Sequence, residues 1–195
     1  MRTAWLAAFL SLAAFPALAD WKPVEQVKTY TVHGDTGAAL YKSIGERGPE
    51  IGNGMRTIAH TSFKLTWTRK YEVRDGACVL SVARPKLIIT YVVPKPAKKL
   101  APAMQAHWDR FASGVLTHEK VHGEHIKEMV RDIEAATLGL TVPDDAACKK
   151  IREEMTVKLG ALSQTQRQRG RDFDRMEMSE GGNIHQLILG LVNSR

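Results

Sequence analysis

The pattern of apolar and polar positions divides the chain into two parts with different periods. In the first part, Phe63, Leu65 and Trp67 alternate with polar residues, which is the period-two pattern of a half-buried strand. Short runs rich in valine, isoleucine, threonine and aromatic residues predict strands at 28–32, 57–71, 78–83 and 86–93. One short helix is expected within 36–44, followed by a glycine-rich loop at 45–54. We predict that this part forms a small antiparallel sheet.

The second part has the period of helices. Between residues 103 and 138 apolar residues recur at spacings of three and four, which predicts one long amphipathic helix. These residues are Met104, Trp108, Phe111, Val115, Ile126, Met129 and Ile133. A second helical pattern starts near residue 144 and continues toward residue 173, and a short apolar piece follows at 184–192. The predicted architecture is therefore α+β, with the sheet packed against two long helices.

The first residues have the features of an export signal. A positive charge at Arg2 precedes an apolar run over 4–14, and Ala17-Leu18-Ala19 supplies small residues at the positions that a signal peptidase reads. The alternative is a membrane anchor, but the run is shorter than the ~20 apolar residues that span a bilayer. We expect residues 1–19 to be a signal peptide that is cleaved after Ala19, leaving no stable membrane anchor. The remaining residues, 20–195, then form one secreted or periplasmic domain, strand-rich over 24–96 and helical over 102–195.

Export changes how the two cysteines are interpreted. In an oxidising compartment two cysteines usually form a disulfide, and here Cys78 and Cys148 allow one pairing. The alternative is a pair of free buried thiols. We predict the bond, which would close a loop worth roughly 4 kcal/mol in the chain-entropy model and join the strand-rich part to the helical part.

Composition excludes several classes of protein. With 195 residues, 44% hydrophobic and 25% charged, the chain is neither disordered nor a multi-span membrane protein. Its formal net charge is +7, and many of the lysines and arginines fall in the strand-rich part, among them Lys64, Arg84 and Lys86. Such a cluster would attract anionic envelope components, although a solvated sheet face is the simpler explanation. We expect no nucleic-acid partner, because no nucleic-acid motif accompanies the charge.

The long helix carries the motif with the clearest chemistry. His118-Glu119-Lys120-Val121-His122 is an H-E-x-x-H sequence. Residues four apart lie about 40° apart around a helix, so both imidazoles point the same way and can bind one Zn²⁺. Glu119 is then placed to act on a water molecule rather than to bind the metal. The alternative is an exposed polar stripe with pairs such as Lys120 with Glu124.

A catalytic zinc needs a third protein ligand, which the motif does not identify. His125 lies ~10 Å along the axis from His118, too far for both to bind one metal with His122 on an unbroken helix. We therefore assign His125 to the surroundings of the metal or to the core. The ligand must come from downstream, where a solvated charged helix end is the alternative explanation for each acid. The candidates are Asp172, Asp174, Glu177, Glu180 and His185.

At these residues the sequence resembles the bacterial domain of unknown function 922 family, described as predicted secreted zinc-dependent proteases. The similarity extends over most of the chain that follows the predicted signal peptide. It includes residues 30–36, 48–50 and Gly54, Trp67, Cys78, Trp108, Phe111, the 118–123 motif and Cys148. The family also tends to carry an aromatic–aspartate pair, then a threonine and a His-Gly. Phe173-Asp174 resembles that pair and implies that Asp174 is the third ligand, whereas Glu177 and Ser179-Glu180 replace the threonine and the His-Gly.

The sequence as a whole predicts an exported zinc peptidase of the H-E-x-x-H type. His118 and His122, with Asp174, would bind Zn²⁺, and Glu119 would be the general base acting on a peptide or protein substrate. His185 is a candidate neighbour of the metal. Two alternatives stay open: a zinc-binding envelope protein without catalytic activity, and a zinc amidase that acts on cell-wall material. The group that would stabilise the oxyanion is not identified, His185 and Arg175 being candidates.

Overall fold

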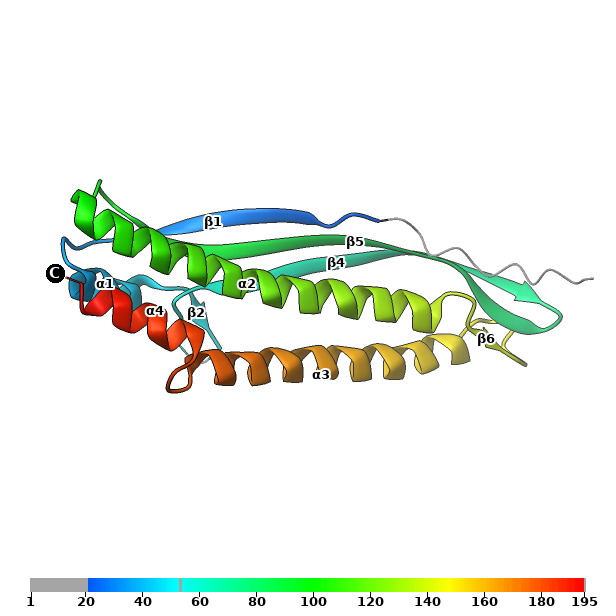
Figure 1. Ribbon diagram of the computed structural model, residues 1–195. Helices are drawn as coiled ribbons and strands as arrows, with labels where there is room; N and C mark the ends of the chain where they lie inside the picture. Colours follow the sequence, from blue (N-terminus) through cyan, green and yellow to red (C-terminus); the bar gives the residue numbers. More distant parts are fainter. Residues whose placement is uncertain (1–20, 53, 195) are drawn as a thin grey trace, which may run out of the picture.

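A computed structural model of the chain describes residues 21–52 and 54–194. This part is α+β, with four helices, a mixed sheet and a separate two-stranded hairpin (Figure 1). The helices are α1 (Gly37–Arg47), α2 (Pro102–Thr137), α3 (Lys150–Met178) and α4 (Asn183–Val192). The strands are β1 (Val24–Val32), β2 (Glu50–Ile51), β3 (Met55–Arg56), β4 (His60–Arg74), β5 (Ala77–Pro96) and β6 (Thr141–Val142). The predicted signal peptide lies outside the described residues.

The four-stranded sheet is mixed because β1 and β4, which lie on either side of β5, run in opposite directions, and the short β6 also pairs with β5. β4 pairs with β5 in antiparallel orientation, but β1 pairs with β5 in parallel, from Val24 opposite Ile88 to Val32 opposite Pro96. The prediction of a purely antiparallel sheet is therefore wrong for β1. A tight turn forces β4 and β5 to be antiparallel, whereas β1 is followed by a helix and a hairpin and is under no such constraint. Alternating residues reveal which side chains share a face, but they do not reveal strand direction.

The central strand is longer than the sequence predicts. The separate strands expected at 78–83 and 86–93 are one strand, β5, in which Pro85 pairs with Trp67 of β4. Pairing with β1 begins only at Ile88. Pro85 therefore lies where the neighbouring β1 is absent, and a proline is tolerated where its missing N–H has no ladder to join. The predicted loop at 45–54 also differs, because it holds the end of α1 and β2, which forms a hairpin with β3.

The long helix α2 lies along the sheet, and α3 runs antiparallel beside it (Figure 1). The residues of β5 that alternate toward the helix meet the apolar stripe that recurs at three and four on α2. This cluster consists of Leu87, Ile89, Tyr91, Ile126, Met129, Val130 and Ile133, all nearly inaccessible to solvent. The strand with a period of two and the helix with spacings of three and four thus pack into one core, as the sequence predicts for an α+β protein.

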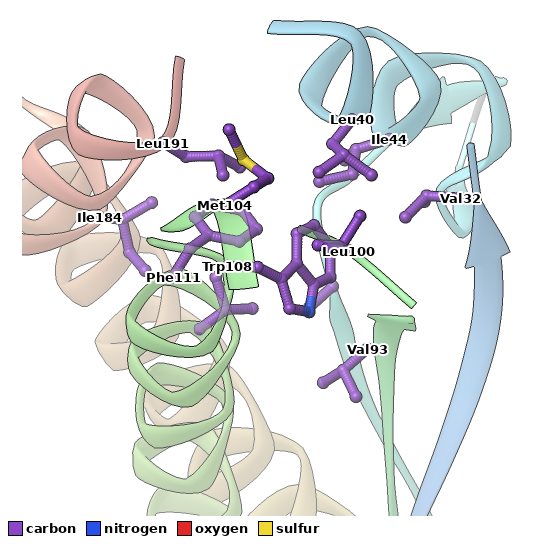
Figure 2. Close-up of a cluster of buried hydrophobic side chains, with 12 residues drawn as sticks. Val32, Leu40, Ile44, Val93, Leu100, Met104, Trp108, Phe111, Ile184 and Leu191 are labelled. Atoms are coloured by element: carbon purple, nitrogen blue, oxygen red, sulfur yellow. The ribbon is translucent and has the colours of Figure 1, made fainter. Parts of the chain in front are cut away.

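A second core at the other end of α2 holds the short helices in place. Figure 2 shows Trp108 of α2 among side chains from α1, β1 and β5. Ile184 and Leu191 of α4 pack into the same cluster, so the short apolar piece predicted at 184–192 is a helix that docks on the start of α2. This docking brings the end of α3, just before α4, close to the middle of α2.

The predicted disulfide is confirmed and it helps to explain where α3 begins. Cys78 and Cys148 are bonded, with their Cα atoms 5.3 Å apart. Cys148 has a φ of 54°, a left-handed conformation that a helix does not contain. The buried carboxylate of Asp145 accepts hydrogen bonds from the N–H groups of Lys149 and Ile151, at 2.8 and 3.0 Å. The helix therefore starts at Lys150 rather than near residue 144 as predicted.

Three basic residues of the strand-rich part, Lys64, Arg84 and Lys86, lie on the side of the sheet away from α2. Lys64 pairs in register with Ile88, and Lys86 and Arg84 follow at alternate positions of β5. Their neighbours along β5, such as Leu87, point to the buried core. In the part of the chain that the structure describes, no helix has the length and apolar character needed to cross a membrane.

Candidate metal centre

His118 and His122 lie one turn apart in the middle of α2, on the side that faces α3. Their side chains are 6% and 15% exposed, so both imidazoles are largely removed from water. The turn of α3 opposite them carries Gly170, where an added Cβ would lie 3.5 Å from Nδ1 of His122. The absence of a side chain at Gly170 lets α3 approach the imidazole closely.

Asp174 of α3 lies at the two imidazoles. Its Oδ1 is 3.1 Å from Nε2 of His118 and 2.8 Å from Nε2 of His122, and the two Nε2 atoms are 3.2 Å apart. A tetrahedral ion with bonds of about 2.0–2.1 Å would hold its ligand atoms about 3.3 Å apart. The three atoms therefore outline a triangle close to one face of such a tetrahedron. This group could bind a metal ion, and two histidines with one carboxylate form a donor set that zinc accepts.

The charges of the three residues are coupled. Burial would raise the pKa of Asp174, but the hydrogen bonds from His118 and His122 outweigh it and hold that pKa below its usual range. For His122 the effect of burial has the opposite sign, because it would lower the pKa of the imidazole. The hydrogen bond to Asp174 outweighs burial, so the pKa of His122 is raised. Without a metal, the site therefore favours a carboxylate next to a cation. A bound cation would take the place of the proton.

Two further residues of α3 surround His118. The ring of Phe173 stacks on the imidazole, with centroids 4.7 Å apart and planes inclined by 19°. Nδ1 of His118 is buried and has no hydrogen-bond partner among the described residues, while Oε2 of Glu177 lies 3.6 Å away. Oε2 also accepts a hydrogen bond from Nδ2 of Asn183, at the start of α4. A carboxylate next to the free nitrogen of a metal-binding histidine is a common feature of zinc sites.

Glu119 lies beside the three residues and is held by the sheet. It is 5% exposed, and its carboxylate accepts a hydrogen bond from the hydroxyl of Thr61, with 2.5 Å between Oγ1 and Oε2. The same hydroxyl oxygen is 3.1 Å from the backbone oxygen of Glu119. Thr61 lies in the first residues of β4, so the edge of the sheet positions this carboxylate. The sequence does not predict this contact, because strand alternation says nothing about which helix residue a threonine meets.

A pocket of about 570 Å³ opens over these residues. Its floor includes His118, Glu119, His122 and Asp174. One wall carries several apolar side chains and comes from β2, β4 and the segment between β3 and β4. The other wall comes from α3. The first wall includes Ile51, Ile58, Ala59 and Phe63, and the α3 wall includes Gln166, Arg167, Gly170 and Arg171. The pocket is large enough for a ligand of several atoms beside a metal.

Neither of the other candidate histidines belongs to the metal group. The ring of His125 is 6.3 Å from that of His122, and its Nδ1 is buried without a hydrogen-bond partner among the described residues. Burial, with the charges of Arg169 and His122, lowers the pKa of His125. His185 lies on α4, where its Nδ1 accepts a hydrogen bond from the backbone N–H of Gly181. His125 is thus a neighbour of the site.

The remaining acidic candidates occupy different places. Asp172 forms an ion pair with Arg175, at 3.1 Å, on the exposed side of α3. Arg175, a candidate for the oxyanion, is not among the described residues that line the pocket. Glu180 is exposed beyond the end of α3. Glu177 is close to the histidines, but it lies against Nδ1 of His118 rather than at the point where the three donor atoms converge.

Comparison with known proteins extends over most of the chain. The family model described as bacterial protein of unknown function (DUF922) matches residues 27–182. This span contains the sheet except for the first three residues of β1, and it contains α2, both cysteines and the three residues that could bind a metal. Neither the curated proteins nor the solved structures provide a significant match. Because the match includes well over half of its residues, the chain belongs to the DUF922 family of bacterial proteins of unknown function.

Proposed function

We propose that this protein is a zinc-dependent hydrolase, and specifically a peptidase that works outside the cytoplasm. One observation carries the proposal: Nε2 of His118, Nε2 of His122 and Oδ1 of Asp174 converge at the floor of a pocket that Glu119 also lines. The same donor set also suits Fe²⁺ in oxygenases. A buried carboxylate next to the ligands supports hydrolysis instead, because hydrolysis needs a base that acts on water.

In this proposal Glu119 transfers the protons of the reaction. When bound, zinc would acidify a water molecule and polarise the scissile carbonyl. Thr61 holds Oε2 of Glu119, so the other carboxylate oxygen accepts a proton from the water as its oxygen bonds to the carbonyl carbon. Glu119 then passes that proton to the amide nitrogen as the carbon–nitrogen bond breaks. The products are a carboxylic acid and an amine, so one water molecule is consumed for each peptide bond that is broken.

The position of β4 supports a peptide as the substrate. β4 is an outer strand, and its residues His60, Thr61 and Phe63 line the pocket. In the described part of the sheet, its pairing partner is β5 alone. An outer strand presents backbone N–H and C=O groups to which an extended peptide can add as a further strand. A substrate bound in this way would pass over Glu119 and the histidines.

The disulfide supports the location. A bond between Cys78 and Cys148 persists in oxidising compartments and is rare in the cytosol. It agrees with the export that the first 19 residues predict. We therefore propose that the protein works in the periplasm or outside the cell, where its substrates would be peptides or proteins of that compartment.

The substitution Glu119→Gln tests the proposal. We expect the wild-type protein, supplied with zinc, to hold one zinc per chain and to cleave a mixture of unstructured peptides. The variant should keep its zinc and lose cleavage by about 10²-fold or more, because the amide cannot accept the proton. Metal analysis and mass spectrometry of the products measure the two quantities separately. Cleavage that survives the substitution, or a zinc-loaded wild type that cleaves no peptide, would refute the peptidase proposal.

A further inference from the structure

Two arginines of α3 line the same pocket as the candidate metal ligands. Arg171 and Arg167 precede Asp174 by three and seven residues, so all three lie on one side of the helix. A rise of about 1.5 Å per residue places the arginines roughly 4.5 and 10 Å along the axis from Asp174. The pocket wall therefore carries positive charge on one side of the reacting centre.

The two arginines are not neutralised by acidic residues. The guanidinium of Arg171 donates to the side-chain oxygen of Gln168, and that of Arg167 donates to the hydroxyl of Ser163. Within the described residues, no ion pair joins either one to a carboxylate. The two neighbouring arginines that do not line the pocket are each paired with an acid: Arg169 with Glu128, and Arg175 with Asp172. Among the four arginines at 167–175, the two that line the pocket are thus the two for which no ion pair with an acid is found in the described part of the chain.

The pocket wall opposite α3 limits the kinds of ligand that the two arginines can bind. It carries the apolar side chains of Ile51, Ile58, Ala59 and Phe63 beside the polar ones of Thr57, His60 and Thr61. A polyanion such as a nucleic acid would leave some of its charged groups against the apolar side chains of that wall, which form no hydrogen bonds. A peptide fits better, because alternate side chains of an extended chain point to opposite sides. One side of such a peptide would meet apolar residues, and the other would meet the arginines.

We infer that Arg167 and Arg171 bind a carboxylate of the substrate and select peptides that are acidic near the cleaved bond. A guanidinium matches a carboxylate with two parallel hydrogen bonds, which makes arginine suited to this task. An extended chain advances about 3.3 Å per residue, so the two arginines lie one to three residues from the centre. The carboxylate is an acidic side chain or the C-terminus of the substrate. The placement relative to the cleaved bond rests on the proposed peptidase function, whereas the capture of a carboxylate does not.

The test compares the binding of two labelled peptides to the zinc-supplemented protein with Glu119→Gln, in which the proposed cleavage is blocked. Both carry apolar residues, and they differ by a single Glu or Gln near the middle; each is made with a free and with an amidated C-terminus. Fluorescence anisotropy should show that the Glu peptide binds about tenfold tighter or more, and that salt reduces this preference. The double variant Arg167→Gln, Arg171→Gln should reduce the preference to less than about twofold. The matched control Arg175→Gln should leave it unchanged.

The outcomes separate this inference from the proposed function. A preference for the free C-terminus that the double variant removes would support the inference and assign the carboxylate to the chain end. Equal binding of all the peptides by the protein that keeps both arginines, or a preference that survives the double variant, would overturn it. Circular dichroism of the variants shows whether α3 is intact. If the Glu peptide binds selectively but the zinc-loaded wild type cleaves no peptide, the peptidase proposal fails, whereas the inference that Arg167 and Arg171 bind a carboxylate stands.

Discussion

Removing the carboxylate of Glu177 should weaken zinc binding through His118. Nδ1 of His118 is buried and lies 3.6 Å from Oε2 of Glu177, so a shift of about 0.7 Å would form a normal hydrogen bond. That bond fixes the tautomer in which Nε2 faces the metal. An unpaired buried donor costs about 1–3 kcal/mol, which corresponds to roughly a 5- to 150-fold loss of affinity. Removing the hydrogen-bond partner of a metal-binding histidine typically lowers the metal affinity about 10- to 100-fold, which is the same range.

The assay is competition for zinc between the protein and a chromophoric chelator at neutral pH. Glu177→Ala should lose about 10- to 100-fold in affinity, and Glu177→Gln less, because the amide keeps an acceptor oxygen. Asn183→Ala removes the hydrogen bond to Glu177 but leaves its carboxylate, so it separates the direct effect from a change in the packing of α4. Asp172→Ala, on the exposed side of the same helix, is the matched control. Wild-type affinity in Glu177→Ala would refute the reasoning.

Three further predictions concern stability and pH. Replacing Cys78 and Cys148 with serine should lower the free energy of unfolding by about 4 kcal/mol, because the bond closes a loop with a separation of 70 residues; chemical denaturation measures it, and an unchanged midpoint would contradict it. Zinc affinity should fall about tenfold per pH unit as the pH drops through the raised pKa of His122, since a proton then competes with the metal while Asp174 stays ionised; flat titrations would contradict this. Gly123→Ala should destabilise the fold by about 1–3 kcal/mol, because the added methyl group would clash with the hydroxyl of Tyr91, which is buried in β5. An unchanged melting temperature would contradict this prediction.

The sequence predicts those features that depend on local spacing. The four-residue interval between His118 and His122 determines their common direction once the segment is helical, and the structure agrees. The pairing of Cys78 with Cys148 follows because the chain has two cysteines. For Asp174, spacing alone leaves several acids as equal candidates, and the resemblance to a family is what favours it. It lies more than 50 residues from the histidines in the chain, and only the antiparallel packing of α3 on α2 brings it to them.

Other features depend on contacts that no local pattern contains. Thr61 meets Glu119 because β4 passes beside the middle of α2, and the period of a strand does not specify its partner helix. The parallel orientation of β1 is decided by the connection that follows it. Arg167 and Arg171 look like any other charges of a polar helix until the structure shows which side of α3 lines the pocket. The sequence therefore predicts the side chains that share a face, whereas tertiary packing decides what each face meets.

A crystal structure of the protein grown with zinc, with anomalous data at the zinc edge, tests the central claim most directly. We predict one zinc within about 2.0–2.2 Å of Nε2 of His118, Nε2 of His122 and Oδ1 of Asp174. Its fourth position should hold water next to the carboxylate of Glu119, open to the pocket. A zinc bound elsewhere, or one that takes Glu119 as a fourth protein ligand and closes the site, would contradict the proposed hydrolase.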